Sequence, residues 1–148
     1  MRRGLTLIEI VIVVALLAVL TGVYFLIANP AGQLASARNN RRTIDLQNIM
    51  LAIKTNIADQ GNGQFGCPSG AVPTSTKNMG SASGSYNIAP CIVPTYIAVM
   101  PFDPSASSSY YNSPSDYNTG YSIIINASGS ITLIAPRFEL GRPVTLTR

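Results

Sequence analysis

The chain has 148 residues, a formal net charge of +4 and no histidine or tryptophan. This length suits one membrane segment and one small domain, and it excludes two full domains. The absence of histidine excludes Ser-His-Asp and Cys-His catalytic sets, and the few carboxylates lie too far apart in sequence to suggest a catalytic pair. We therefore expect no enzyme.

The amino-terminal part carries one long uncharged run. No charged residue occurs from Ile10 to Ala37, and Ile10–Ala28 is close to the roughly 20 apolar residues that a membrane span needs. We expect this run to enter a bilayer. An ordinary secretory signal is the alternative, because Ala35-Ser36-Ala37 fits a small-x-small cleavage pattern and would release a domain that begins at Arg38. The run is longer than the apolar part of such signals, which favours a membrane helix.

Glu9 lies at the start of this run, where a charge is unfavourable. A carboxylate in hydrocarbon costs several kcal/mol unless it finds a partner or reaches the surface. If the chain is cut after Gly4, the new α-amine of Leu5 lies one helical turn from Glu9. A second copy of the chain could pair that amine with this carboxylate. Burial of Glu9 would then be favourable only in a correctly aligned assembly.

The stretch Gly4-Leu5-Thr6-Leu7-Ile8-Glu9, with Arg2 and Arg3 before it and an apolar helix after it, resembles the processing site of the type IV prepilin family, which includes type II secretion pseudopilins. The resemblance implies a leader at residues 1–4 and a transmembrane and filament-core helix at residues 5–30. It also implies that a membrane-embedded aspartyl peptidase cuts between Gly4 and Leu5 and methylates the Leu5 amine. Glu9 would then align neighbouring subunits in a filament.

The same resemblance implies a location and partners. The chain would sit in the cytoplasmic (inner) membrane as a single-pass protein, with its amino terminus in the cytoplasm and its head outside, and then join a periplasmic or extracellular filament. Its partners would be copies of itself, related pilin-like subunits, the prepilin peptidase, the inner-membrane assembly platform and the lipid bilayer.

Residues 31–60 have the pattern of an amphipathic helix half that packs on the head. We expect a kink or extended segment between Gly22 and Pro30, because proline removes a backbone donor and disfavours helical geometry before it. Beyond it, apolar residues recur at steps of three and four and form one stripe: Leu46, Ile49, Met50, Ile53 and Ile57. Gly61-Asn62-Gly63 should end the helix.

The charges of this helix are interpreted as solvent-facing. Arg41 and Asp45 are four residues apart and should pair on the solvent side. Arg38, Arg41 and Arg42 form the only basic cluster beyond the leader. We interpret them as solvated or lipid-headgroup arginines, since a nucleic-acid interface needs a larger basic face.

Residues 61–95 are rich in Gly, Ser, Asn and Pro and are interpreted as a variable loop with a cysteine pair. Cys67 and Cys91 have no Cys-x-x-Cys spacing, so zinc and redox motifs are unsupported. In an exported domain they would form one disulfide, closing a loop of about 25 residues and stabilising by roughly 3 kcal/mol. In a reducing compartment they would be free thiols.

Residues 96–148 should form a small antiparallel sheet and a carboxy-terminal loop. Tyr96–Met100 is a short strand candidate, and Tyr121–Ile125 with Ser130–Ala135 has the pattern of a hairpin with a four-residue loop. Pro143–Leu146 could add an edge strand, where proline is best tolerated. The predicted fold is α+β, pilin-like: a long amino-terminal helix packed on a small antiparallel sheet.

The run Pro101-Phe102-Asp103-Pro104, the tyrosines after it and the hairpin are similar to the carboxy-terminal layout of type II secretion pseudopilins. That likeness implies no obligatory cofactor, but some major pseudopilins bind calcium in this loop. Asp103 and Asp116 are the weak candidates, since calcium prefers oxygen ligands. The simpler interpretation is that both are turn residues.

The expected function is that of a structural subunit of a type IV pilus-like filament, most like a type II secretion pseudopilin. Two alternatives stay open: a type IV surface pilin that serves adhesion, motility or DNA uptake, and a secreted or membrane-anchored binding domain that does not polymerise.

Overall fold

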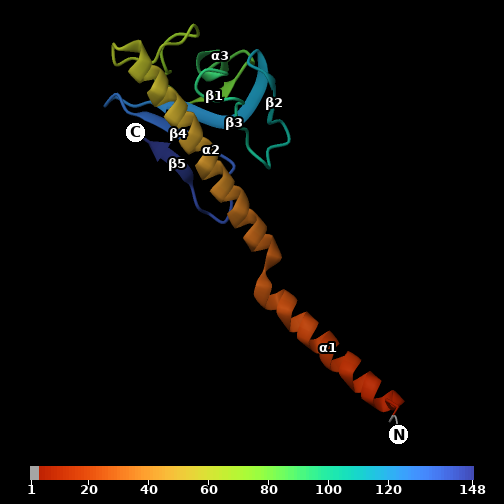
Figure 1. The fold of residues 1–148 in the computed structure, drawn as a ribbon. Coiled ribbons are helices and arrows are strands. Elements are labelled where there is room, and N and C mark those ends of the chain that lie inside the picture. The colour runs from red at the N-terminus through yellow and green to blue at the C-terminus, as the bar shows by residue number, and fades with distance from the viewer. Residues whose placement is uncertain (1–3) are drawn as a thin grey trace. The chain divides into compact units, whose positions relative to one another are not determined.

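The computed structural model describes residues 4–148 and divides them into two compact units, one up to Leu34 and one from Ala35 to Arg148 (Figure 1). Arg2 and Arg3 of the expected leader lie outside the described residues. In chain order the elements are α1 (Leu7–Ala28), α2 (Pro30–Gln60), β1 (Lys77–Gly80), α3 (Ala89–Ile92), β2 (Tyr110–Ser113), β3 (Asp116–Ile125), β4 (Ile131–Ala135) and β5 (Val144–Thr147).

Helix α1 is apolar on all sides, and its described side chains are exposed. Within residues 4–148 a single helical stretch is long and apolar enough to cross a membrane, and its most hydrophobic part lies in α1. A helix that is hydrophobic all round needs lipid or other protein around it, because water alone leaves its whole surface unfavourably exposed.

The break between the two helices falls at Asn29. Its backbone is left-handed, with φ 37° and ψ 62°, and Pro30 begins α2. Its side-chain oxygen accepts a hydrogen bond from the Gly32 N–H at 3.1 Å, which satisfies one donor of the new helix. The predicted interruption between Gly22 and Pro30 is therefore confirmed, and so is the end of α2 at the glycine-containing turn after Gln60.

The second unit contains one antiparallel sheet. Its strand order is β1-β3-β4-β5, and β2 also pairs with β3. The predicted hairpin is confirmed by the pairing of Ile125 with Ile131 and by the hydrogen bond from the Asn126 N–H to the Ser130 carbonyl. The predicted edge strand is confirmed as β5, which pairs with β4.

The core forms where α2 covers one face of this sheet (Figure 1). The predicted stripe supplies the helix side, with Leu46, Ile49 and Ile53 almost fully buried. Every second residue along the middle of β3 points inward, as the two-residue period of a half-buried strand requires. This arrangement is the α+β, pilin-like fold that the sequence predicted.

One predicted strand was wrong. Residues 96–100 form turns and irregular chain after α3, because the N–H groups of Tyr96 and Ile97 bond to the Ile92 carbonyl instead of to a neighbouring strand. The segment still contributes to the core through Met100, which is fully buried. Two short elements, β1 and α3, lie in residues 61–95, which we interpreted as a variable loop. Strand β2 precedes the predicted hairpin and was not predicted.

Candidate assembly site and the polar cluster of the head

The amino terminus of α1 is closed by a reciprocal cap. Thr6 is the N-cap residue, and its hydroxyl accepts a bond from the Glu9 N–H at 3.4 Å. The Glu9 carboxylate in turn accepts from the Thr6 N–H at 2.9 Å and from the Thr6 hydroxyl at 2.8 Å. This is the capping box that a Thr-x-x-Glu sequence favours, and it satisfies helix N–H groups that would otherwise lack partners.

Both contacts to Thr6 use the same oxygen of Glu9, Oε2. Within residues 4–148, Oε1 has no hydrogen-bond partner, and the residue is exposed. The cap therefore holds the carboxylate at a fixed place at the start of α1 and leaves half of it open to a further donor.

The Gly4–Leu5 peptide bond lies just before this cap in non-helical chain. Leu5 is 76% exposed, and even a Cβ atom added at Gly4 would meet no atom within 4 Å. A peptidase needs an accessible substrate segment outside regular secondary structure, and this bond meets both conditions.

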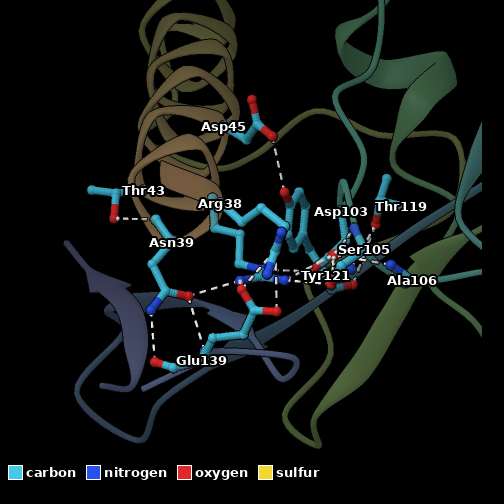
Figure 2. Close-up of polar contacts among 11 residues, drawn as sticks. Arg38, Asn39, Thr43, Asp45, Asp103, Ser105, Ala106, Thr119, Tyr121 and Glu139 are labelled. Carbon is cyan, nitrogen blue, oxygen red and sulfur yellow. Dashed lines mark hydrogen bonds and ion pairs between the residues drawn. The ribbon is translucent and has the colours of Figure 1, made fainter. Parts of the chain in front are cut away.

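A second group of polar residues lies in the head, where α2 meets the segments that contain Asp103 and Glu139 (Figure 2). We call it the polar cluster; its members are Arg38, Asn39, Arg42, Asp45, Asp103, Tyr121 and Glu139. At its centre the Arg42 and Asp103 side chains are both fully buried. They bond in a bidentate manner, from Nε to Oδ2 at 2.8 Å and from Nη2 to Oδ1 at 3.2 Å.

Both Nη atoms of Arg42 form further hydrogen bonds. Nη1 donates to the Asn39 side-chain oxygen at 2.7 Å, and Nη2 donates to the Ser105 hydroxyl at 2.6 Å. Asp103 additionally accepts from the Ser105 N–H at 2.8 Å and the Ala106 N–H at 3.1 Å. A buried ion pair is tolerated only when hydrogen bonds satisfy its remaining donors and acceptors, and this one meets that condition.

Glu139 joins the same cluster from the chain between β4 and β5. Its carboxylate accepts from Arg38 Nε at 2.8 Å and lies 3.6 Å from Arg42 Nη1. Its backbone exchanges two bonds with the side chain of Asn39: the Glu139 N–H donates at 3.0 Å and its carbonyl accepts at 2.7 Å. The turn between β4 and β5 is thereby fixed to α2.

Asp45 completes the cluster on the next turn of α2. It accepts from Arg41 Nε at 3.0 Å and from the Tyr121 hydroxyl at 2.9 Å. The predicted Arg41–Asp45 pair is thus present, but its predicted place on the solvent side is wrong for Asp45, whose side chain is buried. The Tyr121 hydroxyl extends from β3 and supplies the partner that a buried carboxylate needs.

The environments shift the pKa values of the three carboxyl groups in different directions. Burial by itself would raise the pKa of Asp103, but the bonds from Arg42 and from the Ser105 N–H outweigh burial and hold it below its ordinary value. The hydrogen bond from Arg38 lowers the pKa of Glu139. Burial raises the pKa of Asp45 in spite of its bonds to Tyr121 and Arg41.

The interpretation of the three arginines as solvated or headgroup residues was therefore wrong for Arg42, which is fully buried, and Arg38 is held by Glu139. A sequence signal existed: Asn39 and Arg42 lie on the same steps of three and four as Leu46, Ile49 and Ile53. Because the apolar stripe was traced through apolar residues only, these two polar residues on the same face were overlooked.

The two calcium candidates have other partners. Asp103 is paired with Arg42, and Asp116 accepts from the Tyr110 hydroxyl and the Asn112 amide, each at 2.9 Å. No group of three or more His, Cys, Asp or Glu residues suited to a metal occurs in the part of the chain that the structure describes. Calcium at Asp103 would have to displace the guanidinium of Arg42. Calcium binding stays a prediction without a test.

Cys67 and Cys91 form a disulfide with Cα atoms 5.0 Å apart. Asn56 of α2 donates to the carbonyls of Gly66 and Cys91, both at 3.1 Å, and so ties both ends of the bridged loop to the helix. The expectation that the chain contains no Gly-x-Gly-x-x-Gly spacing was wrong, because Gly61–Gly66 has it. It follows a helix instead of a strand, so it lacks the context of a dinucleotide site.

Residues 1–25 match the family model of the prokaryotic N-terminal methylation motif. No curated protein and no solved structure matches the chain. The match covers Gly4, Leu5 and Glu9 and confirms the predicted resemblance to the type IV prepilin-like family. The match supports a type IV pilin-like filament subunit and does not distinguish a pseudopilin from a surface pilin.

Proposed function

We propose that this chain is a structural subunit of a type IV pilus-like filament, most specifically a type II secretion pseudopilin, that is cleaved between Gly4 and Leu5 and polymerises through α1. The observation that carries the proposal is the methylation motif at the start of a helix whose apolar side chains are exposed all round. Lipid covers that surface before assembly, and neighbouring copies of the helix cover it in the filament.

The capped carboxylate of Glu9 determines how neighbouring subunits align. Cleavage after Gly4 leaves the Thr6 N–H and hydroxyl in place, so the cap on α1 survives processing. It also creates a positive α-amine on Leu5, and Oε1 of Glu9 is open to a donor. An unpaired carboxylate in hydrocarbon is costly, and pairing it with a neighbour's Leu5 amine lowers that cost only when two subunits are correctly aligned.

The pseudopilin assignment rests on the carboxy-terminal layout. Asp103, in the Pro101–Pro104 run, is the buried partner of Arg42, so this run fixes the head to its helix. In a pseudopilin the growing filament pushes cargo outward. The prepilin peptidase, the inner-membrane assembly platform and related pilin-like subunits are the proposed partners, in the inner membrane and then in the periplasm. A filament at the cell surface would instead assign the chain to the surface pilins.

Processing is tested by mass spectrometry of the mature amino terminus from cells that express the full chain. We expect a peptide that begins at Leu5 and is heavier by one methyl group. A terminus at Arg38 would mean a released soluble domain and would overturn the proposed assembly.

The role of the charge is tested with Glu9→Gln. Glutamine can keep the capping box, since it also serves at the third helical position, but it cannot form the ion pair. We expect normal membrane insertion and a loss of filament incorporation of about tenfold or more, because even 1.4 kcal/mol changes an equilibrium tenfold.

Thr6→Ala is the matched control, because it removes the hydroxyl of the cap and keeps the charge of Glu9. It should reduce assembly much less than Glu9→Gln. If Glu9→Gln assembles as well as the unchanged chain, the ion pair does not direct polymerisation.

A further inference from the structure

The turn between β4 and β5 exposes two apolar side chains. Phe138 is 41% exposed and Leu140 is 52% exposed. Leu140 also has a left-handed backbone, with φ 58°, which is unfavourable for a residue with a branched side chain. An exposed aromatic and an exposed leucine two residues apart on a strained turn suggest a surface that something else covers.

The charges of the same turn are positive. Arg137 and Arg142 flank the two apolar residues, and both are exposed. Within residues 4–148 neither forms an ion pair, whereas the only carboxylate of the turn, Glu139, is used by Arg38 and Arg42. The turn therefore presents apolar side chains between unpaired guanidinium groups, a combination typical of segments that lie at an anionic lipid surface.

The turn is rigidly fixed at a definite place along α2. Its backbone bonds to Asn39 and its carboxylate bonds to Arg38. Asn39 follows Ala28, the last residue of α1, by about 11 residues. At a helical rise of 1.5 Å per residue, the chain limits their separation to roughly 20 Å, whatever the relative orientation of the two units.

We propose that the turn 136–142 is a membrane-contact surface of the unassembled subunit. Phe138 and Leu140 enter the headgroup region of the bilayer that holds α1, and Arg137 and Arg142 bind the phosphates of anionic lipids. The proposal rests on the proposed function, since it requires α1 to lie in a bilayer. This contact attaches the unassembled subunit to the membrane at a second place besides α1, and filament assembly must break it.

The absence of tryptophan from the chain allows a direct test. Full-length Phe138→Trp is reconstituted in phosphatidylcholine vesicles with phosphatidylglycerol, in which part of the lipid carries bromine near the headgroup end of the acyl chains. Bromine quenches a tryptophan that touches the lipid. We expect Phe138→Trp to be quenched, with an emission maximum at shorter wavelength than that of an exposed tryptophan. Leu140→Trp repeats the measurement in case the first variant fails to fold.

Two further tryptophan variants serve as the negative and the positive control. Leu51→Trp lies on α2 about 18 Å beyond Asn39 and replaces a residue that is 66% exposed, so it should not be quenched. Leu17→Trp lies in the middle of α1 and should be quenched strongly by lipid that carries bromine near the terminal end of its acyl chains. If Leu17→Trp is quenched and both turn variants resemble Leu51→Trp, the membrane contact is refuted and the proposed function stands. If Leu17→Trp is not quenched either, α1 is not in the bilayer and both proposals fail.

The lipid chemistry is tested by adding Arg137→Gln and Arg142→Gln to Phe138→Trp. Each guanidinium near anionic lipid should shift the contact equilibrium by roughly fivefold, so the double substitution should sharply reduce quenching in phosphatidylglycerol vesicles. Shielding of Phe138→Trp that rises with the protein-to-lipid ratio, without bromine quenching, would assign the turn to a neighbouring copy and overturn the proposal.

Discussion

Asp103→Asn tests whether the buried ion pair holds the head on α2. Asparagine keeps an oxygen for the Ser105 and Ala106 N–H groups and a similar shape, so the substitution mainly removes the charge. Removing one partner of a buried pair costs about 3–5 kcal/mol, because the other charge stays buried without compensation. Glu139 lies 3.6 Å from Arg42 and compensates in part, so we expect about 3 kcal/mol, at the lower end of that range.

For a unit of this size the loss corresponds to a fall in Tm of roughly 10–15 °C. The assay is thermal unfolding of the full chain in detergent, followed by near-ultraviolet circular dichroism of its 7 tyrosines. Asp116→Asn is the matched control, since Asp116 is exposed and its loss should cost less than about 0.5 kcal/mol. A double-mutant cycle with Arg42→Gln should give a coupling energy of about 2 kcal/mol or more. If Asp103→Asn matches the control, the ion pair does not hold the head.

Three further predictions concern the stability of the same unit. Replacing Cys67 and Cys91 by serine should cost about 3 kcal/mol, measured by urea unfolding, and equal stability would show that the bridge does not constrain the unfolded chain. Gly120→Ala should cost about 2 kcal/mol, because Gly120 has φ +71° and an added Cβ would lie 3.2 Å from the Cβ of Asp103. Gly129→Ala is the control in the same assay. Gly129 also has a positive φ, but an added Cβ would meet no atom within 4 Å, so this substitution should cost less. When unfolding is measured against pH, the stability that Asp103 and Glu139 contribute should be fully present above their ordinary pKa values of 3.8 and 4.5. It should be lost as the pH falls through their lowered pKa values. Asp45 acts with the opposite sign because its pKa is raised, so Asp45→Asn should make the acid loss steeper, and an unchanged slope would contradict that assignment.

The parts of the fold that sequence predicted correctly depend on local pattern. The helix stripe repeats every three or four residues, and the hairpin places two β-branched runs on either side of a short turn. Asn29 and Pro30 interrupt the helix through backbone sterics alone. Each of these signals lies within a few residues of the feature that it predicts.

Most of the errors concern contacts between distant segments. Arg42 and Asp103 are 61 residues apart, and nothing near either residue specifies the other. Strand β1 has the sequence Lys-Asn-Met-Gly, which is a weak strand former, and exists because it pairs with β3. Tertiary context outweighs local preference in these two cases. Residues 96–100 have strand-like composition, but a competing local turn prevails there, because the Ile92 carbonyl accepts from the N–H groups of Tyr96 and Ile97.

Arg42 and Glu9 are both charged side chains that need a partner when they are buried, and they differ in where that partner lies. Arg42 lies on a helix face that the head covers, and Asp103, Asn39 and Ser105 of the same chain satisfy it. Glu9 lies on a helix whose apolar surface no segment of the described chain covers, and Thr6 occupies only one of its two oxygens. A charge that is satisfied within the chain fixes a fold. In the proposed function, a charge that is placed for burial and left half open selects a neighbour. The contrast between Asp103→Asn, which should destabilise the head, and Glu9→Gln, which should leave the head stable but the subunit unassembled, separates the two roles.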